Sequence, residues 1–117
     1  MSSKRLISIG AHLKVKADVL HSFVGQQNYT IINFIDGKSI MVATSIGVLE
    51  DRLKSYSFFR THKQFIVNLN EVEQLEFIEN YAQIKMKSKQ TFRVARRRTA
   101  DLIHLLLNEN LPIKINS

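Results

Sequence analysis

Residues 59–69 read Phe-Arg-Thr-His-Lys-Gln-Phe-Ile-Val-Asn-Leu, and this run decides the fold. Its first half alternates, so that one side of an extended chain carries residues 59, 61 and 63 and the other side carries residues 60, 62 and 64. Its second half is a fully apolar block, Phe65-Ile66-Val67, which Asn68 closes. We therefore predict a polar, partly basic strand that continues into a buried strand, at an edge that leaves the core and meets an anionic partner.

Most of the remaining sequence also has the period-two pattern of strands. It predicts five further strands, at residues 29–35, 39–42, 72–77, 81–86 and 91–94. The turn between the first two is Asp36-Gly37, a pair that tolerates positive φ. Turns at residues 78–80 and 88–90 join the last three strands into a meander with a wet, basic side. The chain is therefore predicted to be mainly β.

Two segments have helical spacing instead. Ser45 is predicted to cap a short helix in which Glu50 and Asp51 face outward and apolar residues recur at 46, 49 and 53. A second helix is predicted after residues 96–99, with an apolar stripe formed by Leu102, Ile103, Leu106 and Leu107. Pro112 bounds this helix, and the tail at residues 113–115 is predicted either to add an edge strand or to fray.

The composition bounds the class of protein. A chain of 117 residues is long enough for one core, so we expect residues 1–117 to form a single domain. Its 17 Lys and Arg residues outnumber its 10 Asp and Glu residues, which gives a formal net charge of +7. This balance favours a polyanionic partner, nucleic acid first and an anionic membrane surface second, although a basic surface without any partner explains the charge about as well.

Several other classes are excluded or disfavoured. The absence of cysteine excludes disulfides and thiolate metal sites. No apolar run has the length of a signal peptide's core or of a bilayer span, so we expect a cytoplasmic protein with no membrane partner. The histidines at 12, 21, 62 and 104 lack metal-ligand spacing, and no phosphate-binding loop or nucleophile elbow occurs. We therefore expect no enzyme activity, no cofactor, no metal and no small-molecule substrate.

The triplet Arg96-Arg97-Arg98 is the strongest sign of a function. It stands between a predicted strand and the second helix, where guanidinium groups and helix N–H groups can both bind phosphate. Arginine can also bind guanine bidentately in a major groove. The alternative is that the triplet merely solvates the first helical turn, but positive charge there opposes the helix dipole. An anionic partner would offset that cost.

These motifs together resemble the signature of the LytTR family of DNA-binding domains. The first motif is Phe59-Arg60-x-His62-x-x-Phe65-Ile66-Val67-Asn68-Leu69, followed by Val72. The second is Phe92-x-Val94-Ala95-Arg96-Arg97 ahead of a leucine-rich helix. The stretch 23–37, which contains Asn28-Tyr29-Thr30, and the short helix around Leu49 and Leu53 also fit. The resemblance covers about residues 6–108 and leaves residues 109–117 as a C-terminal tail.

The resemblance implies both a fold and a function. The fold is an elongated sandwich of small antiparallel β-sheets with two short α-helices. The function is a sequence-specific transcription regulator that binds double-stranded DNA, with loops and strand ends reaching into successive major grooves. Two copies on a repeated site, as a homodimer on DNA, are implied as well. Family members usually carry a receiver or membrane domain too, so these residues are either a stand-alone regulator or the output domain of a longer response regulator.

The resemblance assigns DNA contact to three segments. They are the loop Gln26-Gln27-Asn28-Tyr29, the pair Asn70 and Glu71, and Arg96 with Arg97 and Arg98 beside it. We expect Asn70 and Glu71 to lie alongside Arg96. The sequence departs from the family pattern at three places. Lys63-Gln64 stands where many members have Arg-Ser, Ala95 stands where many have serine, and Val24 stands where many have an acidic residue. These departures bear on the target sequence more than on the function.

Several of these residues also have a structural interpretation. Arg60 and His62 are more often half-buried structural groups than base readers, Tyr29 fits a strand anchor, and Asn70 and Glu71 fit plain turn residues. The lysines at 85, 87 and 89 are expected to form a solvated face. Two other functions fit the same sequence: an RNA-binding or nonspecific nucleic-acid module, and a protein-interaction domain that uses an exposed β edge such as the tail.

Overall fold

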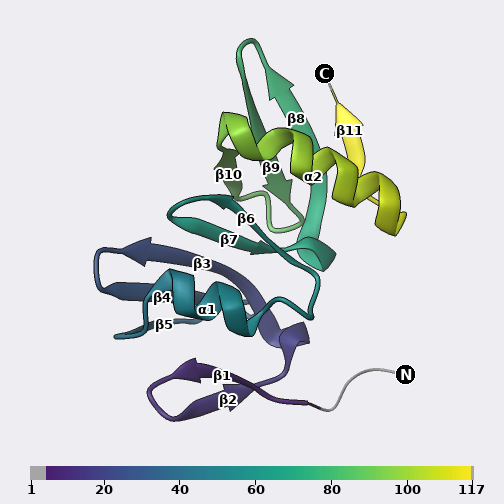
Figure 1. The fold of residues 1–117 in the computed structure, drawn as a ribbon. Helices are drawn as coiled ribbons and strands as arrows, with labels where there is room; N and C mark the ends of the chain where they lie inside the picture. The colour runs from purple at the N-terminus through teal and green to yellow at the C-terminus, as the bar shows by residue number, and fades with distance from the viewer. Residues whose placement is uncertain (1–4, 117) are drawn as a thin grey trace.

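The computed structural model describes residues 5–116, in which eleven strands form three sheets and two α-helices pack against them (Figure 1). The smallest sheet is the hairpin of β1 (Ile7–Gly10) and β2 (Leu13–Val15). The central sheet has the order β5-β4-β3-β7-β6, formed by β3 (Leu20–Gln26), β4 (Tyr29–Phe34), β5 (Ser39–Val42), β6 (Phe58–His62) and β7 (Phe65–Asn68). The third sheet has the order β10-β9-β8-β11, formed by β8 (Val72–Ile78), β9 (Tyr81–Met86), β10 (Thr91–Val94) and β11 (Lys114–Asn116). The predicted mainly β fold with two helices is confirmed.

The predicted turns lie where the sequence places them. Asp36 and Gly37 join β4 to β5; Gly37 has a φ of 94°, and the Asp36 Oδ1 accepts a hydrogen bond from the Lys38 N–H at 2.9 Å. The β8–β9 and β9–β10 connections are also hairpins, and the three strands form the expected meander. Local turn chemistry was therefore a sound guide to these pairings.

The run at residues 59–69 is a hairpin, which corrects the continuous strand that its alternation predicts. β6 ends at His62, Lys63 and Gln64 form the turn, and β7 returns so that Phe59 pairs with Val67. An unbroken strand of eleven residues would span about 36 Å, close to the 41 Å length of the whole body. Reversal buries the apolar block inside the same sheet and leaves only the turn in water.

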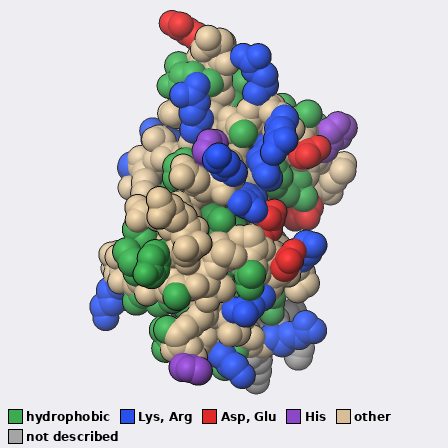
Figure 2. All heavy atoms as spheres, turned by 60° about the vertical axis from the view of Figure 1, so that its left-hand side comes forward, with side chains coloured by type: hydrophobic (Ala, Val, Ile, Leu, Met, Phe, Trp, Pro, Cys, Tyr) green, Lys and Arg blue, Asp and Glu red, His purple; other side chains and the backbone are tan. Residues whose placement is uncertain are grey.

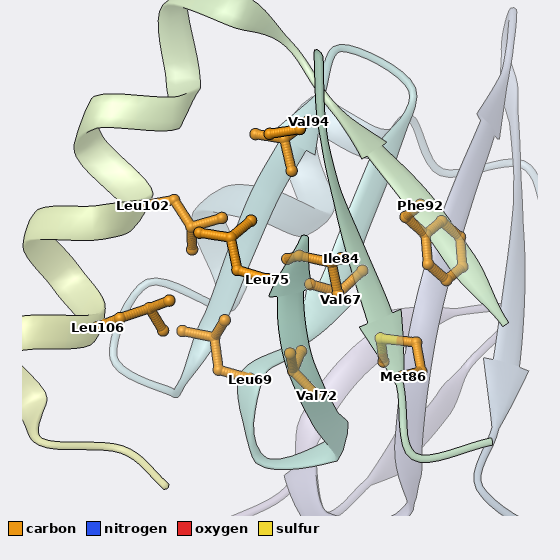
Figure 3. Close-up of a cluster of buried hydrophobic side chains, with 11 residues drawn as sticks. Val67, Leu69, Val72, Leu75, Ile84, Met86, Phe92, Val94, Leu102 and Leu106 are labelled. Atoms are coloured by element: carbon orange, nitrogen blue, oxygen red, sulfur yellow. The ribbon is translucent and has the colours of Figure 1, made fainter. Parts of the chain in front are cut away.

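The central sheet separates two hydrophobic cores, and the apolar block of β7 serves both. Neighbouring residues of a strand point to opposite faces. Ile66 packs with Phe23 in the core that also contains residues of β1 and α1 (Ile46–Arg52). Val67 instead faces the core formed with the third sheet and α2 (Arg96–Glu109), which contains Leu75 and Leu102 (Figure 3). A sheet that is covered on both faces explains why the block does not alternate.

Helix α1 lies where the sequence predicts it. The Ser45 Oγ accepts a hydrogen bond from the Val48 N–H at 3.4 Å, and Leu49 is buried beneath the helix. Asp51 faces outward as predicted. Glu50 does not: it is half-buried, because its carboxylate forms an ion pair with Arg60 at 2.8 Å.

Helix α2 is also present, with a narrower apolar stripe than expected. Leu102 and Leu106 are buried, but Leu107 is 66% exposed, because each step along a helix turns the side chain by roughly 100° away from the buried line. Ala95 precedes the helix and supplies no side-chain cap. Asn110, with a φ of 51°, ends it in the left-handed conformation.

The tail adds an edge strand, one of the two predicted outcomes. β11 pairs with β8 in parallel, with Lys114 opposite Gln74, whereas the other strand pairs of the described residues are antiparallel. β11 lies on the side of Figure 1 opposite the turns that end β1, β3 and β6. Within residues 5–116, no helix is long and apolar enough to cross a membrane.

Candidate nucleic-acid interface

Two turns and one helix start meet at one edge of the molecule, on the left of Figure 1. The Gly25 N–H, at the end of β3, donates to the Gln64 carbonyl at 2.7 Å, so the β3–β4 and β6–β7 turns are direct neighbours. The Ala95 N–H donates to the Thr61 carbonyl at 2.7 Å, which attaches the start of α2 to the same hairpin. We call residues 27–29, 63–64 and 96–97 the turn edge.

The β3–β4 turn presents the first predicted segment to solvent. Gln27 and Asn28 form a two-residue turn, Gln27 has a φ of 51°, and Gln26 pairs with Tyr29 across it. All four side chains are exposed, and Tyr29 is 52% exposed although it begins a strand. Amide and hydroxyl groups are therefore displayed together at the tip of a well-paired hairpin.

Lys63 and Gln64 belong to the turn edge, although the sequence does not single them out. Both are exposed at the turn of the β6–β7 hairpin. The pattern hides them because the alternation of residues 59–64 predicts one continuous strand. The available signal was their place inside the family motif, where this chain departs from the usual residues.

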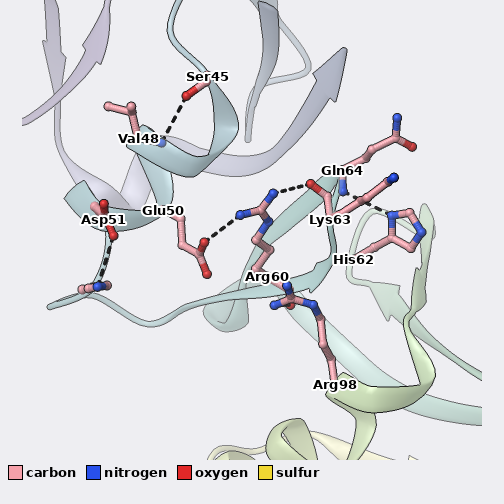
Figure 4. A network of polar contacts seen from close by, with 10 residues as sticks. Ser45, Val48, Glu50, Asp51, Arg60, His62, Lys63, Gln64 and Arg98 are labelled. Atoms are coloured by element: carbon pink, nitrogen blue, oxygen red, sulfur yellow. Dashed lines mark hydrogen bonds and ion pairs between the residues drawn. The ribbon is translucent and has the colours of Figure 1, made fainter. Parts of the chain in front are cut away.

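The Arg60 side chain holds the β6–β7 turn in place (Figure 4). One terminal nitrogen donates to the Glu50 carboxylate at 2.8 Å, and the other donates to the Lys63 carbonyl. The Gln64 N–H donates to His62 Nδ1 at 3.2 Å, and the His62 ring lies 5.3 Å from the Phe65 ring. The Arg60 side chain is only 17% exposed and His62 is half-buried, as the structural interpretation of these two residues expects.

The three arginines at the start of α2 differ from one another. Arg96 and Arg97 are exposed. Arg98 is half-buried, and its guanidinium donates to the Arg60 carbonyl at 3.2 Å, which fastens the helix to β6. Arg96 also lines an open hollow of about 620 Å³, together with His62, Tyr81 and Arg93. The arrangement leaves two guanidinium groups facing solvent and uses the third as an anchor.

Asn70 and Glu71 do not lie alongside Arg96, contrary to expectation. They belong to the 3-10 turn Leu69–Glu71, at the opposite end of β7 from Gln64. Four residues of strand separate the two turns by about 13 Å. Asn70 and Glu71 line a different hollow, of about 490 Å³, together with Asp18. The expectation failed because β7 runs away from the turn edge instead of toward it.

Basic side chains gather on the face that carries the turn edge. Figure 2 shows this face, with Lys and Arg side chains over its upper half and again toward its lower end, and fewer Asp and Glu side chains. Arg93 stacks on the Tyr81 ring at 4.2 Å. Away from the turn edge, Lys89 is paired with Glu73 at 2.7 Å and lowers the pKa of that carboxyl group, so the expected solvated lysine face is partly neutralised.

A buried histidine joins the central and third sheets. His21 Nδ1 lies 2.8 Å from the Ser22 Oγ, and Nε2 lies 3.0 Å from the Ser88 Oγ in the β9–β10 turn. Burial lowers the pKa of His21, and the charge of Glu71 opposes part of that effect. Residues 5–116 contain no group of three or more His, Cys, Asp or Glu side chains that could hold a metal ion.

Comparison with known proteins agrees with this architecture. The fold is similar to the LytTr DNA-binding domain of a Bacillus cereus protein assigned as a methyl-accepting/DNA response regulator, with a TM-score of 0.74, 18% sequence identity, and coverage of 89% of this chain and 98% of that chain. No curated protein matches the sequence. The family model of the LytTr DNA-binding domain matches residues 11–107, which is most of the chain. The chain therefore belongs to the LytTr DNA-binding domain family.

Proposed function

We propose that the protein is a sequence-specific transcription regulator that binds double-stranded DNA through the turn edge. The observation that carries this proposal is the convergence of three segments, distant in sequence, whose exposed side chains are amides, a phenol and cations. Membership in the family supports DNA as the partner. We propose no catalytic role.

The side chains of the turn edge match the chemistry of a major groove. Arg96 and Arg97 can donate bidentately to guanine O6 and N7, and Gln27, Asn28 or Gln64 can bind the N6 and N7 positions of adenine. Lys63 suits phosphate or guanine. These groups sit on turns anchored by backbone hydrogen bonds, so little order has to be gained on binding.

The other predicted residues have different roles in this proposal. Arg98 positions α2, because its guanidinium is already committed to the Arg60 carbonyl. Asn70 and Glu71 lie outside the interface, and the carboxylate of Glu71 would repel phosphate. We retain the proposal that two copies act on a repeated site, since a single turn edge reads a short sequence.

Double-stranded DNA fits this surface better than single-stranded RNA. Modules that read RNA bases stack them on aromatic side chains displayed on a sheet face. Here Phe23 and Phe92 are buried, and Phe58, Phe59 and Phe65 pack against the cores. The exposed polar groups are at turns, where they can enter a groove.

Selection of bound duplexes from random DNA at two salt concentrations tests the proposal. We expect an enriched motif that persists at the higher salt concentration, and enrichment no greater than background would overturn sequence specificity. Replacing Arg96 with Ala should weaken binding to the selected duplex by about 1–3 kcal/mol if Arg96 reads a base. Arg98→Ala serves as the matched control: its loss should appear mainly as lower stability of the protein. An equal loss for Arg96→Ala on a scrambled duplex would make Arg96 a phosphate contact.

A further inference from the structure

The β1–β2 turn, Ala11–His12, is joined to the turn edge by a short chain of contacts. Gly10, just before the turn, packs so closely on β5 and the segment after it that a Cβ there would lie 2.6 Å from Thr44 Oγ1. The Thr44 carbonyl accepts a hydrogen bond from Thr30 Oγ1 at 2.7 Å, and Thr30 directly follows Tyr29. Figure 1 likewise shows the β1–β2 turn on the same side as the β3–β4 and β6–β7 turns.

The hairpin that carries this turn is firmly placed. Ile7 and Ile9 are buried in the core under the central sheet. On the outer side of β1, the Ser8 carbonyl accepts a hydrogen bond from the Arg52 guanidinium at 3.0 Å, which ties the hairpin to the end of α1. The turn is therefore presented by a rigid support.

The turn itself has an uncommon backbone. Ala11 and His12 both have positive φ, 54° and 61°, although neither is glycine, and both are exposed. Positive φ at both central residues is what a tight two-residue hairpin turn requires, and here it is adopted without glycine. In the neighbouring β3–β4 turn Gln27 has a positive φ of 51° but Asn28 does not. The two turns therefore share a side of the molecule but not a turn type.

The hairpin also carries basic side chains and no acidic ones. Residues 7–15 contain no Asp or Glu, but they contain His12 and Lys14. Arg5 and Lys16 lie elsewhere, at the hollow that Asp18 and Glu71 also line. Lys14 pairs with Ser8 on the strand face opposite Ile7 and Ile9, and it is exposed. The Arg52 guanidinium adds positive charge at the edge of β1, where it binds the Ser8 carbonyl. Such a surface attracts an anion and offers few groups that could distinguish bases.

We infer that the β1–β2 hairpin is an additional DNA-contacting element, in which Lys14 binds the sugar–phosphate backbone beside the groove that the turn edge enters. The inference rests on the proposed function and extends it. The family model begins at residue 11, inside this turn, so the match gives no role to β1. The contact would lengthen the DNA footprint without changing the preferred sequence.

Lys14→Gln in the full chain tests this inference, with Lys38→Gln as the matched control. Lys38 is also an exposed lysine, in the β4–β5 turn at the other end of β4. We expect Lys14→Gln to weaken binding to the selected duplex and to a scrambled duplex by the same factor, and to reduce the slope of log affinity against log salt by about 0.9. Lys38→Gln should leave both quantities as in the wild type, and thermal unfolding should be the same for all three proteins.

The outcomes separate this inference from the proposed function. Wild-type affinity and salt slope in Lys14→Gln would overturn the inference while the selected motif still supports the function. A loss on the selected duplex alone would also overturn it, because Lys14 would then read a base. A wild-type protein that binds no duplex would instead overturn the proposed function itself.

Discussion

The turns at the two ends of β7 differ in their exposure, their contacts and the charge of their neighbours. At one end, Lys63 and Gln64 are exposed, and contacts from Arg60 and His62 hold their turn among other basic groups. At the other end, the 3-10 turn Leu69–Glu71 is closed by Asn68 and lies near an aspartate. The contrast teaches that a residue next to a signature motif need not lie on the surface that the motif presents, because one short strand leads to another surface.

The largest expected effect is on stability, at the far end of β7. Asn68 is buried, its amide donates to the Leu20 carbonyl at 2.7 Å, and its Oδ1 accepts from the Asn70 N–H at 3.0 Å. Asn68→Ala should lower the free energy of unfolding by about 3 kcal/mol, since it leaves buried groups without partners. Urea denaturation measures this loss, and Asn70→Ala should show almost none. A change in the selected DNA motif for folded Asn68→Ala would contradict the separation of the two ends.

The next effect, at the Lys63–Gln64 end of β7, changes both the stability of the protein and its DNA preference. Arg60→Ala should lower the free energy of unfolding by about 2 kcal/mol and also broaden the selected motif, because the Lys63 carbonyl loses its donor. Duplex selection on the variant measures the second effect. Glu50→Gln is the milder companion, since a neutral amide can still accept from the guanidinium. An unchanged motif in Arg60→Ala would show that the turn keeps its shape without this contact.

Substitutions at the Lys63–Gln64 turn and at the Leu69–Glu71 turn compare the two ends of β7 directly in DNA affinity. Lys63→Ala and Gln64→Ala should each weaken binding to the selected duplex by about 1–2 kcal/mol relative to a scrambled duplex. Asn70→Ala and Glu71→Gln should change it by less than about 0.5 kcal/mol. Fluorescence titration at one fixed salt concentration measures all four. The reverse ranking would move the interface to the other end of β7.

The smallest effect is a pH dependence of stability at His21. Burial lowers the pKa of His21 in the folded chain below its ordinary value of 6.5, so near that pH the unfolded chain binds more protons. The stability contribution is fully present above about pH 6.5 and is lost as the pH falls below that value. Urea denaturation at pH 5.5 and 7.5 should show this loss, and His21→Gln should reduce it. A loss of the same size in the variant would assign it to another group.

Local sequence signals predicted much of the fold. Asp36-Gly37, the later two hairpins and the Ser45 cap depend on contacts within a few residues, so pattern alone reveals them. The β1–β2 hairpin and the Lys63–Gln64 turn are not predicted, because neither turn contains the glycine or Asx residues that mark a tight turn in a sequence. Packing against distant parts of the chain keeps both turns closed, and a short window of sequence does not show that packing.

The arrangement of the proposed interface follows only partly from the sequence. Residues 27–29 and 96–97, which the sequence proposes for DNA contact, lie on one edge of the structure, and their role in binding remains a proposal. Asn70 lies elsewhere and Lys63 joins this edge for one reason: the direction of β7 depends on where the chain reverses. The role of Arg98 depends on a contact with a residue 38 positions away, which spacing cannot reveal.

The direction of the first and last strands has a consequence for how this fold can be built into longer polypeptides. β1 runs toward its turn from the opposite side, and β11 lies on that opposite side too (Figure 1). A segment fused before β1 or after β11 would therefore be joined to the fold on the side opposite the turn edge. A sensor, a tag or a reporter could therefore be attached at either the N-terminal or the C-terminal end without obstructing the recognition surface.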